Sequence, residues 1–111
     1  MTILFPGKVV WDVGNWVVRR FIDDAARHLD EAPTLAPDIE DALLSGISGL
    51  NLSEPTAAML EEAVRLVDQV IAANLVSLGN DFHDPSVFPI YLEKLRELRG
   101  LILAARPVGS D

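Results

Sequence analysis

The residues of this chain with the clearest chemical potential are carboxylates crowded into one stretch. Ten of them fall between Ile22 and Glu62, where Arg27 is the single cation, so this segment carries a formal charge of −9. The remaining residues sum to +1, which gives −8 for the whole chain. A concentration of one sign of charge attracts oppositely charged partners and speeds their association. The segment therefore predicts either a docking surface for a basic protein or a solvated surface that keeps the chain soluble.

The carboxylates fall on the end of a first predicted helix, the loop after it, a second helix and the start of a third. Because these elements are consecutive, we expect their carboxylates to share one face. The predicted partner-binding residues are Asp23, Asp24, Asp30, Glu31, Asp38, Glu40 and Asp41, with Glu61 and Glu62 at the edge of the face.

Metal binding is the second chemistry that the residue types allow, and their spacing argues against it. Asp24 and His28 stand four residues apart on one predicted helix, and Asp81, His83 and Asp84 fall in a predicted loop. Neither group supplies three ligands at a diagnostic spacing, and the sequence has no Glu-x-x-His pair of the kind that di-iron bundles use. We expect no metal and no other cofactor.

Nucleophilic catalysis and phosphate binding find little support in the sequence. The chain has no cysteine, which removes thiolate nucleophiles, thiolate metal ligands and disulfides. No serine lies in a Gly-x-Ser-x-Gly turn, and no glycine-rich phosphate loop is present. We therefore expect a protein that is not an enzyme. The net charge of −8 likewise disfavours direct binding to nucleic acid.

Length and composition predict one helical domain over residues 1–111, with a flexible tail from about residue 107 to 111. Half of the residues are hydrophobic, which is ample for a compact core. No apolar stretch is long enough for a signal peptide or for a bilayer-spanning helix. We expect a cytoplasmic protein without a membrane partner.

The elements that must position the carboxylates follow from hydrophobic periodicity. Residues 1–7 read as an extended lead-in, and apolar residues then recur at helical spacing from Lys8 to about Leu29. A second helix starts with Pro37 in its first turn and ends by about Leu50, near two glycines.

The third and fourth helices have the most regular patterns. The third runs from Thr56 to Leu78, with Ser53 as the expected N-cap, and the fourth runs from about Pro89 after a short turn at residues 85–88. Four helices with short connections predict an all-α fold, a small irregular four-helix bundle with a short extended N-terminal lead-in.

Three side-chain placements complete the expectations. Arg19 and Arg20 stand four residues before Asp23 and Asp24, a spacing that favours ion pairs on a helix. Trp11 and Trp16 are five residues apart and project onto different sides of a helix; core placement of both is favoured over exposure of one at an interface.

In size, charge and predicted fold class, the chain resembles small acidic helical proteins that neutralise a basic toxin, such as bacterial immunity proteins for nuclease toxins. The resemblance implies a non-enzymatic inhibitor that docks an acidic face over a cationic cleft. Two alternatives remain open. One is a structural or adaptor module that forms a homodimer through an apolar helix face, and the other is a nucleic-acid mimic that regulates a nucleic-acid-binding protein.

Overall fold

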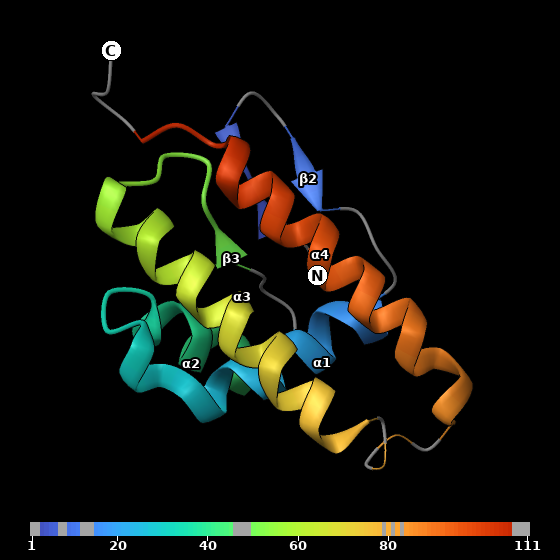
Figure 1. The fold of residues 1–111 in the computed structure, drawn as a ribbon. Coiled ribbons are helices and arrows are strands. Elements are labelled where there is room, and N and C mark those ends of the chain that lie inside the picture. The colour runs from blue at the N-terminus through green and yellow to red at the C-terminus, as the bar shows by residue number, and fades with distance from the viewer. Residues whose placement is uncertain are drawn as a thin grey trace.

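The fold is a helical bundle with a small sheet at one end, seen in a computed structural model that describes residues 3–6, 9–11, 15–45, 50–78, 80, 82 and 84–107 (Figure 1). The helices are α1 (Asn15–Ala25), the 3-10 helix η2 (Ala26–Glu31), α2 (Ala36–Ser45), α3 (Ala57–Ser77), the 3-10 helix η3 (Pro85–Val87) and α4 (Phe88–Ala104). The strands are β1 (Ile3–Leu4), β2 (Val10–Trp11) and β3 (Leu50–Asn51). The predicted all-α class is confirmed, and the bundle is irregular because α1 and α2 are much shorter than α3 and α4.

The two long helices, α3 and α4, pack side by side in opposite directions (Figure 1). Their predicted positions are confirmed within one residue, and η3 occupies the turn predicted at 85–88. Leu78 adopts a left-handed conformation with φ of 52°, and its N–H donates to the Asn74 carbonyl at 2.9 Å, which closes α3.

The sheet corrects the expectation of a helix from Lys8. β1 lies in the middle, antiparallel to β2 and parallel to β3, so Ile3 faces both Trp11 and Leu50 in register. Val10 and Trp11 favour extended backbone because branched and aromatic side chains fit a pleated surface. The helix therefore starts at Asn15, and Gly14 lies outside the described residues.

Three further expectations were wrong at element ends. The first helix does not continue to Leu29 as α-helix, because His28 has non-helical φ and ψ of −128° and 30° within η2. The second helix stops at Ser45, and Leu50 belongs to a strand rather than a helix end. The N-cap of α3 is Thr56, whose hydroxyl accepts from the Met59 N–H at 3.1 Å, whereas Ser53 donates to the Asn51 side chain.

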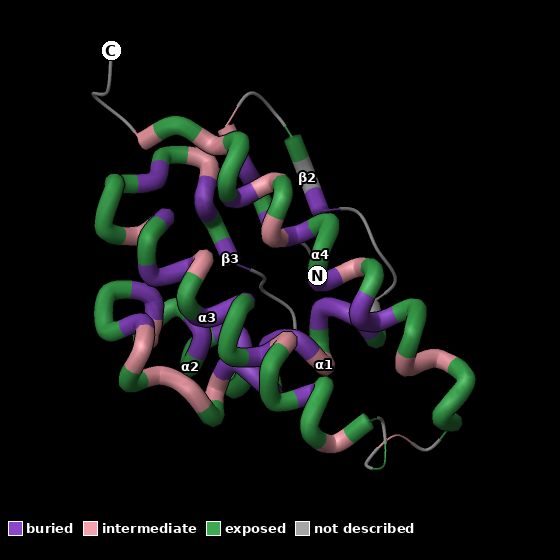
Figure 2. The backbone as a smooth tube through the Cα atoms, viewed as in Figure 1, coloured by how far each residue is buried: buried purple, intermediate pink, exposed green. Residues whose placement is uncertain are grey.

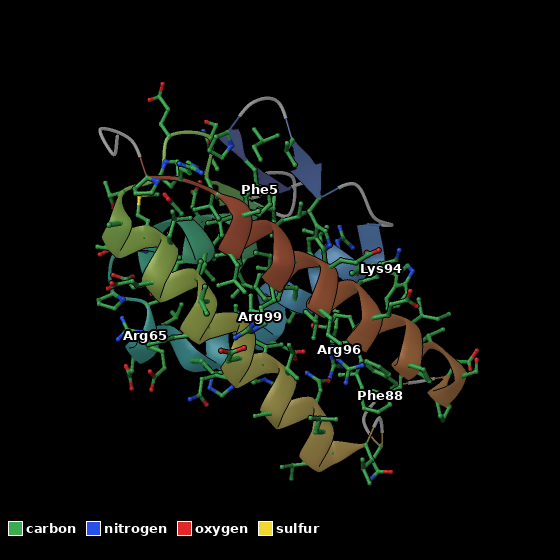
Figure 3. The ribbon with its side chains drawn as sticks, turned by 45° about the horizontal axis from the view of Figure 1, so that its top comes forward. Phe5, Arg65, Phe88, Lys94, Arg96 and Arg99 are labelled. Atoms are coloured by element: carbon green, nitrogen blue, oxygen red, sulfur yellow. The ribbon has the colours of Figure 1, made fainter. Side chains whose placement is uncertain are left out.

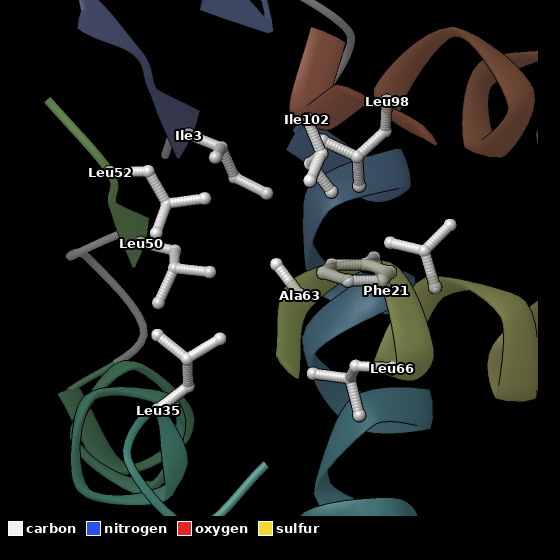
Figure 4. A pocket seen from close by; sticks show the side chains of 10 residues that line it. Ile3, Phe21, Leu35, Leu50, Leu52, Ala63, Leu66, Leu98 and Ile102 are labelled. Atoms are coloured by element: carbon white, nitrogen blue, oxygen red, sulfur yellow. The ribbon is translucent and has the colours of Figure 1, made fainter. Parts of the chain in front are cut away.

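The core lies between the sheet and the inner faces of α1, α2, α3 and α4, as the buried stretches in Figure 2 show. Phe21, Leu66 and Leu98 point into its centre from the helices, and Ile3 and Leu50 point in from the strands (Figure 4). The space between them is about 10 Å³ and is lined by apolar side chains. An apolar void of this size offers no polar partner to a water molecule and binds no ligand of functional size.

The tryptophans divide between core and surface. Trp11 is buried and meets Phe21 edge to face, with ring centroids 5.9 Å apart. Trp16 is 44% exposed and covers Tyr91 at 6.3 Å. The expectation that both lie in the core was wrong for Trp16, which acts as an outer layer over a buried tyrosine.

The cap assignment gives a direct stability test. Thr56→Ala removes the side chain that satisfies a free N–H at the start of α3, and we expect a loss of about 1 kcal/mol in the free energy of unfolding. Ser53→Ala is the matched control, with an expected change within about 0.5 kcal/mol, because its hydrogen bonds are exposed. Urea titration of both variants measures the difference; a larger loss for Ser53→Ala would contradict the assignment.

Candidate functional site

The predicted contact carboxylates separate into exposed and buried groups. Asp23, Asp30, Asp38, Glu40, Asp41 and Glu61 are exposed, and Glu31 is half-buried. Asp24 and Glu62 are only 6% and 5% exposed. The last two are therefore wrong as members of a docking face, since a partner cannot reach a carboxylate inside the bundle.

The buried Asp24 accepts hydrogen bonds from side chains on three helices. Its Oδ2 atom accepts from the Arg20 Nε at 3.1 Å on its own helix, from the Asn74 Nδ2 at 3.0 Å on α3, and from the Tyr91 hydroxyl at 2.9 Å on α4. A buried carboxylate is tolerated only where charged or polar partners replace its lost water. Asp24 therefore fixes α1 relative to α3 and α4.

The surroundings of Asp24 strengthen this cluster. The Arg20 guanidinium lies 4.3 Å from the centre of the Phe82 ring and 5.8 Å from that of Tyr91, a cation–π arrangement. Burial and then the negative charge of Asp24 raise the pKa of Tyr91 far above its usual value. The raised pKa favours the neutral, hydrogen-donating form of Tyr91. The predicted ion pair of Arg20 with Asp24 is confirmed.

The buried carboxylate of Glu62 has a different role, which is to accept hydrogen bonds at the start of α2. Its Oε1 atom accepts from the backbone N–H groups of Thr34 at 2.8 Å and Leu35 at 3.2 Å. These amides precede α2, where the helix itself offers no partner for them. Burial acts to raise the pKa of Glu62, but the hydrogen bonds from Thr34 and Leu35 and the charge of Arg65 outweigh it and lower the pKa below 4.5.

Five exposed carboxylates and the half-buried Glu31 make up what we call the acidic surface: Asp23, Asp30, Glu31, Asp38, Glu40 and Asp41. They lie on α1, η2 and α2, three consecutive elements that pack against one another (Figure 1). Within the described ranges, none of the six forms an ion pair, so the expected pairing of Arg19 with Asp23 is not found. Glu61 does not belong with them, because it lines a groove between α3 and α4.

A polar hollow of about 80 Å³ lies beside the Asp24 cluster, between the end of α1 and α3. Asp24 and His28, which stand four residues apart, both line it, as do Arg20 and Arg27. The two guanidinium groups disfavour a cation there, and in the described part of the chain no three His, Asp or Glu side chains gather closely enough to hold a metal ion. Asp81 and His83 lie outside the described residues, while Asp84 caps η3 by accepting from the Ser86 N–H at 3.0 Å.

Comparison with models of protein families, with curated proteins and with solved structures finds no match to this chain. Across the described residues, no helix has both the length and the apolarity to cross a bilayer.

Two neighbouring aspartates provide a test of the Asp24 cluster. Asp24→Asn keeps the shape of the side chain but removes the charge that Arg20, Asn74 and Tyr91 share, and we expect it to lower the free energy of unfolding by about 1 to 3 kcal/mol. Asp23→Asn makes the same chemical change at an exposed site and should stay within about 0.5 kcal/mol. Denaturant titration at pH 7 compares them; equal effects would show that Asp24 is not the central acceptor.

The lowered pKa of Glu62 predicts that its contribution to stability depends on pH. The folded state lowers the pKa of Glu62, so its stabilising contribution is complete above 4.5 and is lost as the pH falls through the lower folded value. Glu62→Gln should lose about 1 kcal/mol at pH 7, and its difference from the wild type should shrink as the pH falls below 4.5. Thermal melts between pH 3 and 7, with Glu61→Gln as the control, measure this; a constant difference across that range would count against the capping role.

Proposed function

We propose that this chain is a non-enzymatic protein-binding module whose acidic surface docks on a basic protein, as in an immunity or antitoxin-type inhibitor that covers the cleft of a toxin such as a nuclease. The observation that carries the proposal is the outer side of α2. There Asp38, Glu40 and Asp41 are all exposed, and Leu44, one turn after Glu40 and Asp41, is 87% exposed.

The geometry of α2 explains why these side chains face outward. Residues along an α-helix are about 100° apart, and the buried residues Ile39 and Ala42 fix the side that faces the core. Leu44 then lies opposite that side, one turn after Glu40 and Asp41. An exposed leucine of this kind gives a contact surface an apolar centre, and carboxylates next to it give a polar rim.

The charge of this surface indicates the kind of partner. A nuclease binds the phosphates of its substrate through Lys and Arg side chains. Its cleft is therefore positively charged and complements the negative charge of the acidic surface. Carboxylates placed over such a cleft would occupy the positions of phosphates and block substrate entry. Long-range attraction would raise the association rate, while the desolvated contacts around Leu44 would set the dissociation rate.

The buried carboxylates support this use of α2. Glu62 holds the start of the helix through the Thr34 and Leu35 amides, and Asp24 holds α1 behind it. A surface that is already rigid loses less conformational entropy when it binds, which favours affinity. We place the module in the cytoplasm, where a toxin directed at nucleic acid would have to be neutralised.

The proposal is tested with the product of the gene adjacent to the one encoding this chain. The two proteins are purified together, and their association rate is measured at about 0.05 M and about 0.5 M salt, where screening shortens the reach of charge. We expect a stable complex, inhibition of the partner's activity, and an association rate that falls at least about tenfold at the higher salt. A metabolic enzyme as the neighbour, or an association rate that salt leaves unchanged, would contradict the proposal.

A matched pair of variants separates position from net charge. Asp38→Asn, Glu40→Gln and Asp41→Asn together remove three charges from α2, and Glu54→Gln, Glu93→Gln and Glu97→Gln together remove three exposed charges elsewhere. The first variant should weaken binding at least about tenfold, and the second should leave the affinity nearly unchanged. Equal losses would mean that the partner responds to total charge and not to α2.

A further inference from the structure

An open apolar groove of about 450 Å³ runs between the start of α3 and the end of α4. Leu60, Val64 and Ile102 form its apolar lining, and Glu61, Arg65, Leu103 and Ala105 complete its walls. Leu103 is 58% exposed, so it rises from the edge of the groove as an apolar projection. Figure 3 shows Arg65 on α3 and Arg99 on the neighbouring α4.

An ion pair one turn away links the two helices that form the groove. The Arg99 Nε donates to the Asp68 Oδ1 at 2.7 Å, which links α4 to α3. The walls therefore come from two helices already joined to each other. A preformed groove needs little ordering when it is filled.

The charges at the groove balance each other. Glu61 and Arg65 both belong to α3 and both line the groove, and among the described residues neither is in an ion pair. The surface is complementary to itself. It holds a negative group, Glu61, and a positive group, Arg65, and it has both an apolar projection, Leu103, and an apolar groove. A two-fold axis brings the same patch of two copies together, so each such group meets its opposite.

We propose that this groove is the contact surface of a homodimer with a two-fold axis. Leu103 of each copy enters the groove of the other copy, and Glu61 pairs with the partner's Arg65. The occupant is a second copy because the groove has no net charge, unlike the acidic surface, and supplies both halves of each contact. The surface is distinct from α2, so the dimer does not depend on the proposed function.

The size of the groove sets the expected affinity. Stable protein interfaces bury about 800 Å² on each partner, and a single groove with one leucine projection covers only part of such an area. We therefore expect a reversible dimer with a dissociation constant of about 10 to 100 µM.

The experiment is sedimentation velocity of the full chain from about 5 µM to about 1 mM. The wild type should change from monomer to dimer over this range, and Leu103→Asp should weaken dimerisation at least about tenfold, because it puts an unpaired charge into an apolar contact. Val76→Asp is the matched control, since Val76 is 84% exposed at the other end of α3, and it should dimerise like the wild type. A monomer at every concentration, or Leu103→Asp with wild-type affinity, would overturn the proposal.

A charge exchange tests the arrangement of the two copies. Glu61→Arg places like charges together and should weaken the dimer, whereas Glu61→Arg combined with Arg65→Glu restores opposite charges and should recover it. Thermal melts verify the fold of each variant, because Arg65 also acts on Glu62. Assemblies larger than a dimer, or no recovery in a double variant that is folded, would refute the two-fold contact. The triple amide variant of α2 should dimerise normally, so failure here leaves the acidic docking proposal intact.

Discussion

The structure depends on one buried negative charge, the carboxylate of Asp24. A charge inside a protein is unfavourable unless several donors surround it, and here those donors come from α1, α3 and α4. The requirement works in both directions, because Tyr91 and Asn74 are also buried and need an acceptor. Hydrophobic packing alone would tolerate small rotations of these helices against one another. The shared oxygen permits far fewer arrangements, since each donor must reach it at hydrogen-bond distance.

Glu62 applies the same principle to the short helix α2. This helix has only ten residues, so it would be marginally stable in isolation and depends on contacts with the rest of the bundle. The carboxylate supplied by α3 satisfies the amides at its start and joins it to the longest helix of the bundle. Two of the ten carboxylates in the acidic segment are thus structural, and they hold the elements on which the other acidic groups are displayed.

The sequence was sufficient to predict those helices in which the apolar pattern repeats over many turns. α3 and α4 repeat their apolar residues over many turns, and their bounds could be predicted closely. The strand Val10–Trp11 could not be predicted, because two residues show no periodicity. Its existence depends on pairing with β1 at Ile3, which in turn pairs with Leu50 of β3. At the site, composition located the acidic segment but could not sort its members. Asp23 and Asp24 are the same residue type side by side, and only the donors on distant helices decide which one is buried. The adjacent pair Glu61 and Glu62 carried a usable signal, since neighbours on a helix point in different directions.

The parallel pairing of β1 with β3 has a consequence for how the chain acquires its structure during synthesis. Ile3 meets Leu50 only after the intervening residues have been made, a wait of roughly 2 to 9 seconds at ordinary ribosomal speeds. Until then the first strand has β2 as its available neighbour, and its buried isoleucine is left without the far wall of its pocket. Closing a segment of this length also costs conformational entropy before the contact between the strands adds any stabilising energy. The N-terminal strand is therefore made early and secured late, after α1, η2 and α2 have emerged within the span that it encloses.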